Sequence, residues 1–173
     1  MRSRAILLSI LMLASVISPV LASDTVTTTD VEISGNHTMT GNYTVSHGTT
    51  LTIKSGASVD MGEFWMKVEG GLVATDATIM SSVQSTSPGG HNAGVWDDIT
   101  ITATGTASLT NVTISNAKSC LIVDGTLTAT DLVLEDCLIG MEVAGTADVT
   151  DLVARNIDHD GVRLTGTVTL SNP

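Results

Sequence analysis

The chain has 173 residues, of which 18 are Asp or Glu and 7 are Lys or Arg, so its formal net charge is −11 at pH 7. A surface this acidic repels nucleic acid and anionic membranes, which excludes both as partners. Charged residues are nevertheless only 14% of the chain and hydrophobic residues are 42%, so the chain is not a disordered acidic tail and suits one folded domain.

Residues 1–22 have the features of a secretory signal peptide. Arg2 and Arg4 precede an apolar run over 5–16, and the small residues of 20–22 suit a cleavage site. An uncleaved anchor is the alternative, which the shortness of the run disfavours. No later segment is long enough to span a bilayer. We therefore expect a secreted or cell-surface protein with no membrane span in the mature chain.

Two further regions follow the signal peptide, and the second contains a loop insertion. Residues 23–47 are polar and irregular, and we expect a short N-terminal cap of one or two strands there, because an exposed parallel edge invites aggregation. Residues 48–173 show the alternation of apolar and polar residues that is typical of strands. A loop insertion is expected at 81–94, where Pro and Gly residues interrupt the alternation.

A repeat of about 20 residues dominates the C-terminal part of the chain. Gly-Thr pairs recur at steps of 20, 20 and 21 residues, beginning at Gly105, Gly125, Gly145 and Gly166. Eleven residues after the first three of these glycines stand Asn116, Asp136 and Asn156. Self-similarity at a fixed period of this length indicates a repeat architecture, and we expect each set of residues to form a structural ladder.

Each repeat reads as three short strands separated by Gly, Asn and Asp, and such a unit cannot bury its own apolar face. It can do so as one turn of a coil stacked on the next at about 4.8 Å, with parallel pairing between turns. Leu132, Leu134, Met141 and Val143 should then point inward. Thr128 and Glu142 should be exposed, with Glu142 paired to Arg163 on the neighbouring turn.

The sequence also carries a resemblance. GTTLTIKSGASVDMG, VEGGLVATDATIMSS, a Gly-rich loop and VWDDITIT, followed by Asn-studded repeats, resemble the N-terminal part of right-handed parallel β-helix surface proteins with the pectin-lyase-like fold. The likeness covers about residues 40–173. It implies an all-β, right-handed parallel β-helix, to which we add a short N-terminal cap and an open C-terminal end. The chain departs from the family at Asp97-Asp98, where glycines are usual.

Cysteines and sequons offer possible modification sites. When successive repeats are aligned, Cys120 and Cys137 are offset by three positions. We therefore expect separate, mostly buried thiols in preference to a disulfide. Asn36, Asn42 and Asn111 each begin an Asn-x-Ser/Thr glycosylation sequon.

The residues offer only weak candidates for catalysis or metal binding. The best acidic patch is Asp136, Asp158, Asp160 and Arg163, beside His159, and it resembles the polygalacturonase motifs only loosely. A lyase would need calcium-binding carboxylates next to a basic proton acceptor, and basic residues are few here. We expect no cofactor, and we consider calcium at Asp97, Asp98 and nearby loop oxygens as a weaker alternative.

The leading hypothesis is a non-catalytic extracellular β-helix module with a structural or adhesive role at a cell surface or in a matrix. A cell-surface glycan or protein would be its partner. The alternatives are a polysaccharide lyase or hydrolase, and an ion-binding or small-ligand protein that uses the loop at 81–94. Because no cap is evident after the last repeat, we expect the chain to be the N-terminal part of a longer helix, or to associate end to end through this edge.

Overall fold

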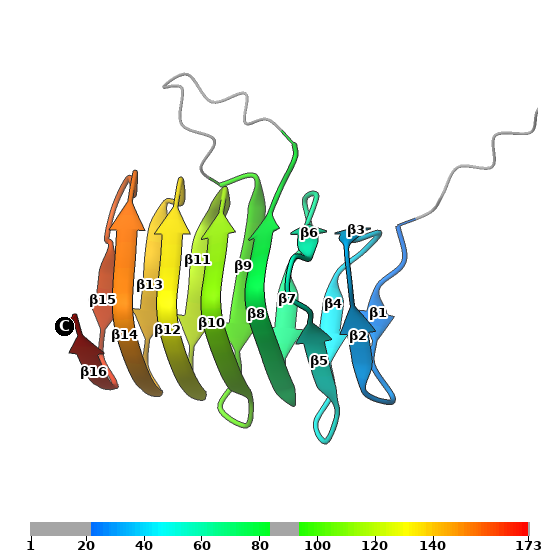
Figure 1. Cartoon of the computed structure of the whole chain (residues 1–173), viewed down its shortest axis with the longest axis horizontal. Helices are drawn as coiled ribbons and strands as arrows, with labels where there is room; N and C mark the ends of the chain where they lie inside the picture. The colour runs from blue at the N-terminus through cyan, green and yellow to red at the C-terminus, as the bar shows by residue number, and fades with distance from the viewer. Residues whose placement is uncertain (1–21, 84–93, 173) are drawn as a thin grey trace, which may run out of the picture.

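The computed structural model describes residues 22–83 and 94–172. Nearly all of the expected signal peptide and most of the expected loop at 81–94 lie outside these residues. The described residues are all-β and form a parallel β-solenoid of about 7 turns (Figure 1). No helix among them is long and apolar enough to cross a membrane.

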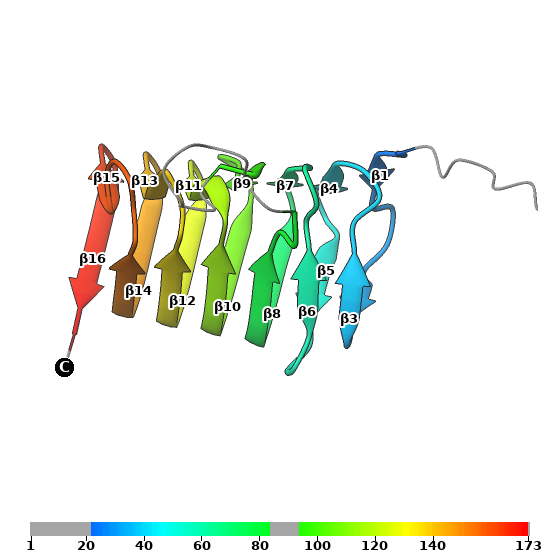
Figure 2. The same cartoon turned by 90° about the horizontal axis from the view of Figure 1, so that it is seen from above.

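Two sheets run the length of the coil on opposite sides of its interior (Figure 2). The seven-stranded sheet contains β1 (Thr25–Val26), β4 (Tyr43–Val45), β7 (Met66–Val68), β9 (Trp96–Ile101), β11 (Ala117–Val123), β13 (Ile139–Val143) and β15 (Val162–Leu164). The nine-stranded sheet contains β2 (Val31–Ile33), β3 (Asn36–Thr38), β5 (Thr50–Ile53), β6 (Ser58–Asp60), β8 (Gly71–Met80), β10 (Thr106–Ser115), β12 (Thr126–Glu135), β14 (Thr146–Arg155) and β16 (Thr167–Ser171).

The repeats stack in the predicted register. Every strand pair in the described residues is parallel, and Thr106, Thr126, Thr146 and Thr167 follow one another across β10, β12, β14 and β16. The glycine before each threonine is required by close stacking. A Cβ added to Gly145 or Gly166 would lie 2.2 Å from the carbonyl oxygen of the preceding glycine in the column. Close contact between turns therefore requires glycine at these positions.

Residues in the left-handed backbone conformation form the corners of the coil. Asn116, Asp136 and Asn156 have φ values of 67°, 54° and 53°, as expected for Asn and Asp at sharp corners. A second corner divides each ten-residue strand of the nine-stranded sheet into two straight halves. Its residues have φ between 47° and 57°, and they are Asp76, Asn111, Asp131 and Asp151.

The core is one continuous apolar interior. Leu132, Leu134, Met141 and Val143 are buried and Thr128 is exposed, as predicted. Glu142 was expected to be exposed, but only 30% of its side chain is accessible because Arg163 of the next turn lies against it. Trp96 is completely buried, and its indole nitrogen donates a hydrogen bond of 2.8 Å to the Ser115 carbonyl.

Residues 23–47, for which cap strands were expected, contain the strands β1 to β4. Each of these strands pairs in parallel with the following turn, β1 with β4, β2 with β5, β3 with β6 and β4 with β7. The segment therefore has the same coil geometry as the repeats, although its sequence lacks their period.

The expectation of separate thiols was wrong, because Cys120 and Cys137 form a disulfide with a Cα–Cα distance of 5.9 Å. Strict alternation would point Cys120 outward. However, β11 has one extra residue relative to β9 between Ser119 and Ile122, and this bulge buries Ser119, Cys120 and Leu121 together. Cys137 follows the Asp136 corner and points inward, so the two sulfurs meet in the core.

The strands β15 and β16 end the two sheets at one end of the described coil. The open C-terminal edge expected from the sequence does not include Ala147 and Val149, because β16 pairs with β14 and both residues are buried. Leu164 and Leu170 lie at this edge and are each 47% exposed.

We predict that Leu134→Ala lowers the free energy of unfolding by about 2–5 kcal/mol, because it leaves a cavity in a continuous core. Thr128→Ala, on the same strand but facing outward, should be almost silent. Chemical denaturation of both variants measures the difference, and equal losses would contradict the inward and outward assignment.

The disulfide should contribute about 3 kcal/mol, since it closes a loop of 17 residues in the unfolded chain. We expect the Cys120→Ala/Cys137→Ala double variant to lose this amount and to be insensitive to reductant. Non-reducing peptide mapping of the native chain should find the two cysteines linked. Two free, alkylatable thiols in the folded protein would contradict the assignment.

Candidate functional site

The outer face of the seven-stranded sheet gathers the charged side chains that the sequence singled out. Lys67 lies beside Thr100, and Glu142 lies beside Arg163, because parallel pairing aligns outward positions on neighbouring turns. Columns of this kind place residues 20 to 33 positions apart in the sequence next to one another. We refer to this surface as the charged face.

Arg163 is the centre of an ion-pair network on the charged face. Its Nη2 donates to Asp160 Oδ2 at 2.6 Å and its Nη1 donates to Glu142 Oε2 at 3.2 Å. The hydrogen bond with Asp160 and the nearby Glu142 carboxylate raise the pKa of the guanidinium. The predicted pair of Glu142 with Arg163 is thus confirmed, and each charge of the network has a partner.

The other acidic residues near this patch do not converge on Arg163. The backbone nitrogens of Asp158 and His159 donate to the carbonyls of Cys137 and Leu138, which holds the inserted residue of the 21-residue turn against its neighbour. Asp136 accepts a hydrogen bond of 3.2 Å from Asn156 Nδ2 at the corner. The structure therefore brings Asp160 together with Arg163 and leaves Asp158 exposed.

Asp97 and Asp98 differ in their surroundings. Asp97 pairs with Lys118 of the next turn. Asp98 is more buried, and this burial raises the pKa of its carboxyl, although the hydrogen bond of 2.6 Å from Thr100 Oγ1 opposes the shift. Among residues 22–83 and 94–172, no group of three His, Cys, Asp or Glu side chains is arranged to hold a metal ion.

A shallow cleft beside Asp98 was not predicted from the sequence. It has a volume of about 260 Å³ and is lined by Trp65, Lys67, Asp98 and Thr100. Trp65 and Lys67 lie just before and on β7, and Asp98 and Thr100 lie on β9, so β8 and the loop insertion separate the two halves of the lining in the sequence. Their alignment depends on the register across the loop, and no repeat period passes through it.

The three sequons occupy different environments. Asn36 is exposed on β3. Asn42 is half-buried, and its Oδ1 accepts a hydrogen bond of 3.3 Å from the Trp65 backbone nitrogen. Asn111 has φ of 53°, and its Nδ2 donates to Asp76 Oδ1 at 2.8 Å. Asn36 and Asn111 are both exposed, and within the described residues Asn36 is the one of the three whose side-chain amide makes no hydrogen bond to the protein.

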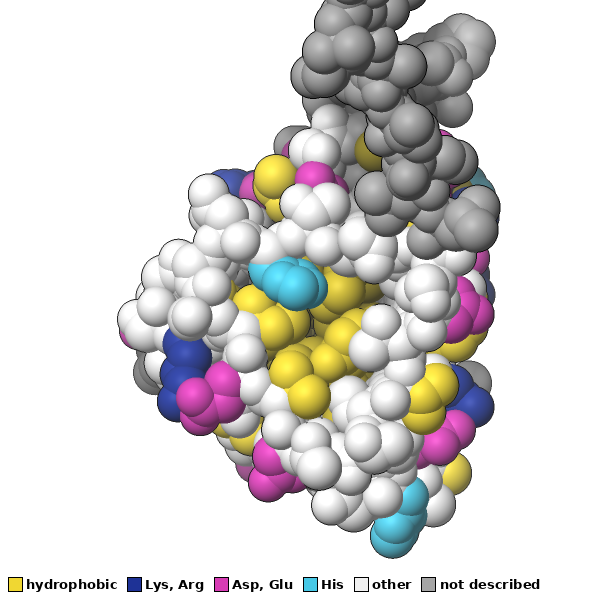
Figure 3. Space-filling model, turned by 90° about the vertical axis from the view of Figure 1, so that its right-hand side faces the viewer, with side chains coloured by type: hydrophobic (Ala, Val, Ile, Leu, Met, Phe, Trp, Pro, Cys, Tyr) yellow, Lys and Arg dark blue, Asp and Glu magenta, His cyan; other side chains and the backbone are white. Residues whose placement is uncertain are grey.

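The end of the coil that carries β1 is hollowed. Figure 3 looks onto this end and shows hydrophobic side chains at the bottom of the hollow. The hollow has a volume of about 400 Å³, and its lining includes Ile33, His37, Met39 and Tyr43. It is the end of the apolar interior.

Asp98 and Asp60 should change the stability of the protein with pH in opposite directions. The raised pKa of Asp98 means that the folded state binds more protons than the unfolded state just above pH 3.8, so stability falls as pH rises through that window. Burial also favours a raised pKa at Asp60, but hydrogen bonds from Ser82 and Gly62 outweigh it and lower the pKa. Asp60 therefore stabilises the fold above pH 3.8, and this contribution disappears as pH falls below its folded pKa.

Stability curves of Asp98→Asn and Asp60→Asn test these signs. Relative to the native chain, Asp98→Asn should gain stability as pH rises above about 4, whereas Asp60→Asn should lose stability as pH rises toward about 4 and change little above it. Parallel curves for the two variants would contradict the assignment.

Comparison with known proteins adds no family to this description. A scan against protein-family models, a search of the curated proteins and a search of the solved structures each found no match for the chain.

Proposed function

We propose that the chain is a non-catalytic extracellular module, a rigid structural or adhesive rod at a cell surface or in a matrix. The observation that carries this proposal is that its Lys and Arg side chains are engaged in ion pairs. All the basic residues after Arg4 form ion pairs, and they are Lys54, Lys67, Lys118, Arg155 and Arg163. Apart from Lys67, which pairs with Glu69 just after its own strand, each joins two neighbouring turns.

These pairs support a structural role because they hold turns together at the surface, where the ladder is otherwise joined by backbone hydrogen bonds. Lys118 with Asp97 and Arg163 with Glu142 do this on the charged face, and Arg155 with Glu135 does it on the nine-stranded sheet. In a solenoid each turn contacts only its neighbours, so stability adds turn by turn along the rod. A stiff spacer with repeated side faces is the natural use of such a molecule.

The resemblance to right-handed parallel β-helix surface proteins with the pectin-lyase-like fold supports the same proposal. Residues 1–22 are proposed as the signal peptide that exports the chain, and a cell-surface glycan or protein is proposed as its partner. The exposed Leu164 and Leu170 would join a following turn of a longer chain or the end of a second copy.

The cleft beside Asp98 favours a second candidate, an enzyme that acts on acidic polysaccharides. It combines an aromatic side chain, a lysine and a partly buried carboxyl group with a raised pKa. Such an enzyme also needs a base that is free to take a proton, and Lys67 is instead 2.7 Å from Glu69. We therefore rank the structural role first.

Export and catalysis are tested separately. In the source organism, protease treatment of intact cells should remove the tagged full chain, whereas a variant lacking residues 2–22 should be protected inside. Recovery of the full chain only from the cytoplasmic fraction would contradict the extracellular role.

Catalysis is tested on acidic polysaccharides with the purified chain, by measuring new reducing ends. We expect none from the native chain and none from Lys67→Ala or Arg163→Ala. Release by the native chain that either variant abolishes would replace the structural proposal with the enzymatic one.

A further inference from the structure

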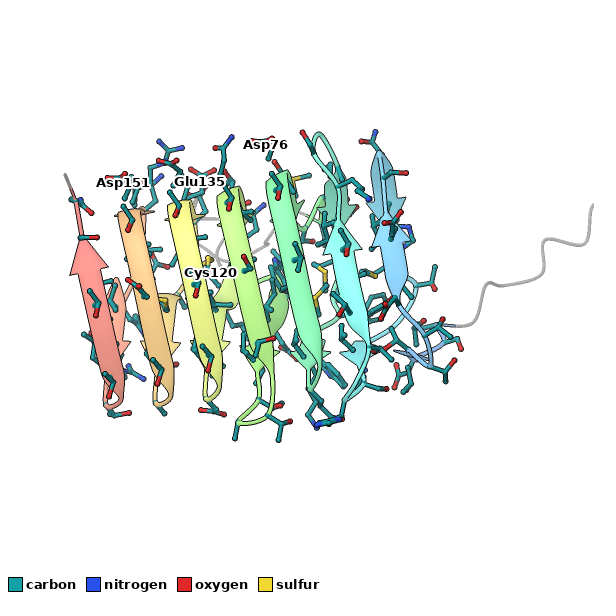
Figure 4. All side chains as sticks on the ribbon, turned by 60° about the horizontal axis from the view of Figure 1, so that its bottom comes forward. Asp76, Cys120, Glu135 and Asp151 are labelled. Carbon is teal, nitrogen blue, oxygen red and sulfur yellow. A yellow bond between two sulfur atoms is a disulfide. The ribbon has the colours of Figure 1, made fainter. Side chains whose placement is uncertain are left out.

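The outer face of the nine-stranded sheet carries a two-dimensional array of hydroxyl groups. It consists of the outward residues of the first halves of β10, β12, β14 and β16, and we call it the threonine face. Parallel pairing aligns these residues in three rows that run along the coil axis. Figure 4 shows the strands side by side with short side chains at matching heights.

Two of the rows contain only Thr and Ser. The first row is Thr106, Thr126, Thr146 and Thr167, and all of its members are exposed. The third row begins at Thr110 and ends at Ser171, with threonine in the two positions between them.

The middle row contains the single exception. It runs Ser108, Thr128, Asp148 and Thr169, so Asp148 is the one charged residue among the twelve positions. In a chain with a net charge of −11, a face this poor in charge is unusual.

Threonine is not simply the default residue of this coil's exterior. The second halves of the same strands also point residues outward, and there the aligned row is Thr113, Val133 and Val153. The next aligned row contains the pair of Glu135 with Arg155. The hydroxyl array stops at the corner formed by the left-handed Asn and Asp residues.

The array is rigid and regularly spaced. Neighbouring members of a row are about 4.8 Å apart, and neighbouring rows are about 6.6 Å apart along a strand. Threonine is branched at Cβ, so its side chain has few rotamers, and each hydroxyl and methyl group is held in place by a backbone ladder. Little conformational entropy is therefore lost when the array meets a surface.

The hydroxyl groups of the threonine face are available to solvent. Within the described parts of the chain, they form one hydrogen bond with other protein groups, 3.1 Å between Thr150 Oγ1 and Ser171 Oγ. Each hydroxyl can donate and accept a hydrogen bond, and the methyl groups between them restrict the orientation of nearby water.

Two other occupants fit the face less well. It spans about 300 Å² at standard strand spacings, whereas a stable protein interface buries about 800 Å² on each partner. Sugar rings stack on aromatic side chains, and none of the twelve positions is aromatic. Water in a lattice needs only fixed donors, acceptors and methyl groups at regular spacing.

We propose that the threonine face binds ice. The oxygen atoms on the exposed planes of ice repeat in two dimensions on the same length scale as the rows of hydroxyls. Water held between the hydroxyl and methyl groups would join this lattice and attach the protein to the crystal surface. Asp148 interrupts the middle row, because its charge holds water in a different geometry.

The test measures the gap between the melting and freezing temperatures of a single ice crystal, and the crystal's shape, with the full chain at millimolar concentration. We expect a gap and faceted crystals with the native chain. Asp148→Thr, which completes the middle row, should widen the gap, and Thr128→Lys should abolish it. Thr113→Lys, outward on β10 beyond the corner, should leave it unchanged.

Other outcomes overturn the proposal. Thermal unfolding must first show that the variants are folded, and Ser108→Lys replaces Thr128→Lys if that variant is not. Round crystals with no gap for the native chain would refute ice binding, as would an equal loss in Thr113→Lys. Sedimentation showing that the native chain dimerises and Thr128→Lys does not would assign the face to a second copy.

Discussion

The coil depends on one left-handed residue at the same position of successive turns. The positive φ of a single residue bends the strand at this position, and the hydrogen bonds to the neighbouring turns continue on both sides of the bend. The residues are Asp76, Asn111, Asp131 and Asp151. Only Gly, Asn and Asp adopt this conformation at small cost. Asn and Asp also have side chains that bond along the column, as Asn111 does with Asp76. The bend lets both halves of a ten-residue strand bury their apolar face in one core.

Because the backbone ladder does most of the joining, the outward residues are free to differ from face to face. The charged face holds inter-turn ion pairs and a cleft beside Asp98, whereas the threonine face is nearly free of charge. The corner residues mark where the threonine face ends within the nine-stranded sheet. One repeated fold can in this way present chemically distinct surfaces along a single rod, which is the property that the proposed structural and ice-binding roles use.

The disulfide and the glycine column show how closely the turns approach each other. A methyl group at Gly145 would overlap the carbonyl of the turn before it, so no other residue fits there without displacing the ladder. The bulge in β11 turns Cys120 into the core at the point where Cys137 enters from the next corner. The link joins two turns next to the strand that follows the 81–94 insertion, where the repeat period is broken.

The sequence by itself determined the stacked repeats from Gly105 to Asn172, their register, and the inward and outward residues, because a fixed period combined with alternation leaves only one way to bury the apolar positions. It did not determine the coil strands of residues 23–47, whose spacing has no period. Nor did it determine the pairing of Cys120 with Cys137, since a bulge of one residue reverses the direction of a side chain. The cleft that joins Lys67 to Thr100 was decided only by the tertiary structure. The register across the inserted loop is set by packing around Trp96, and no local pattern encodes it.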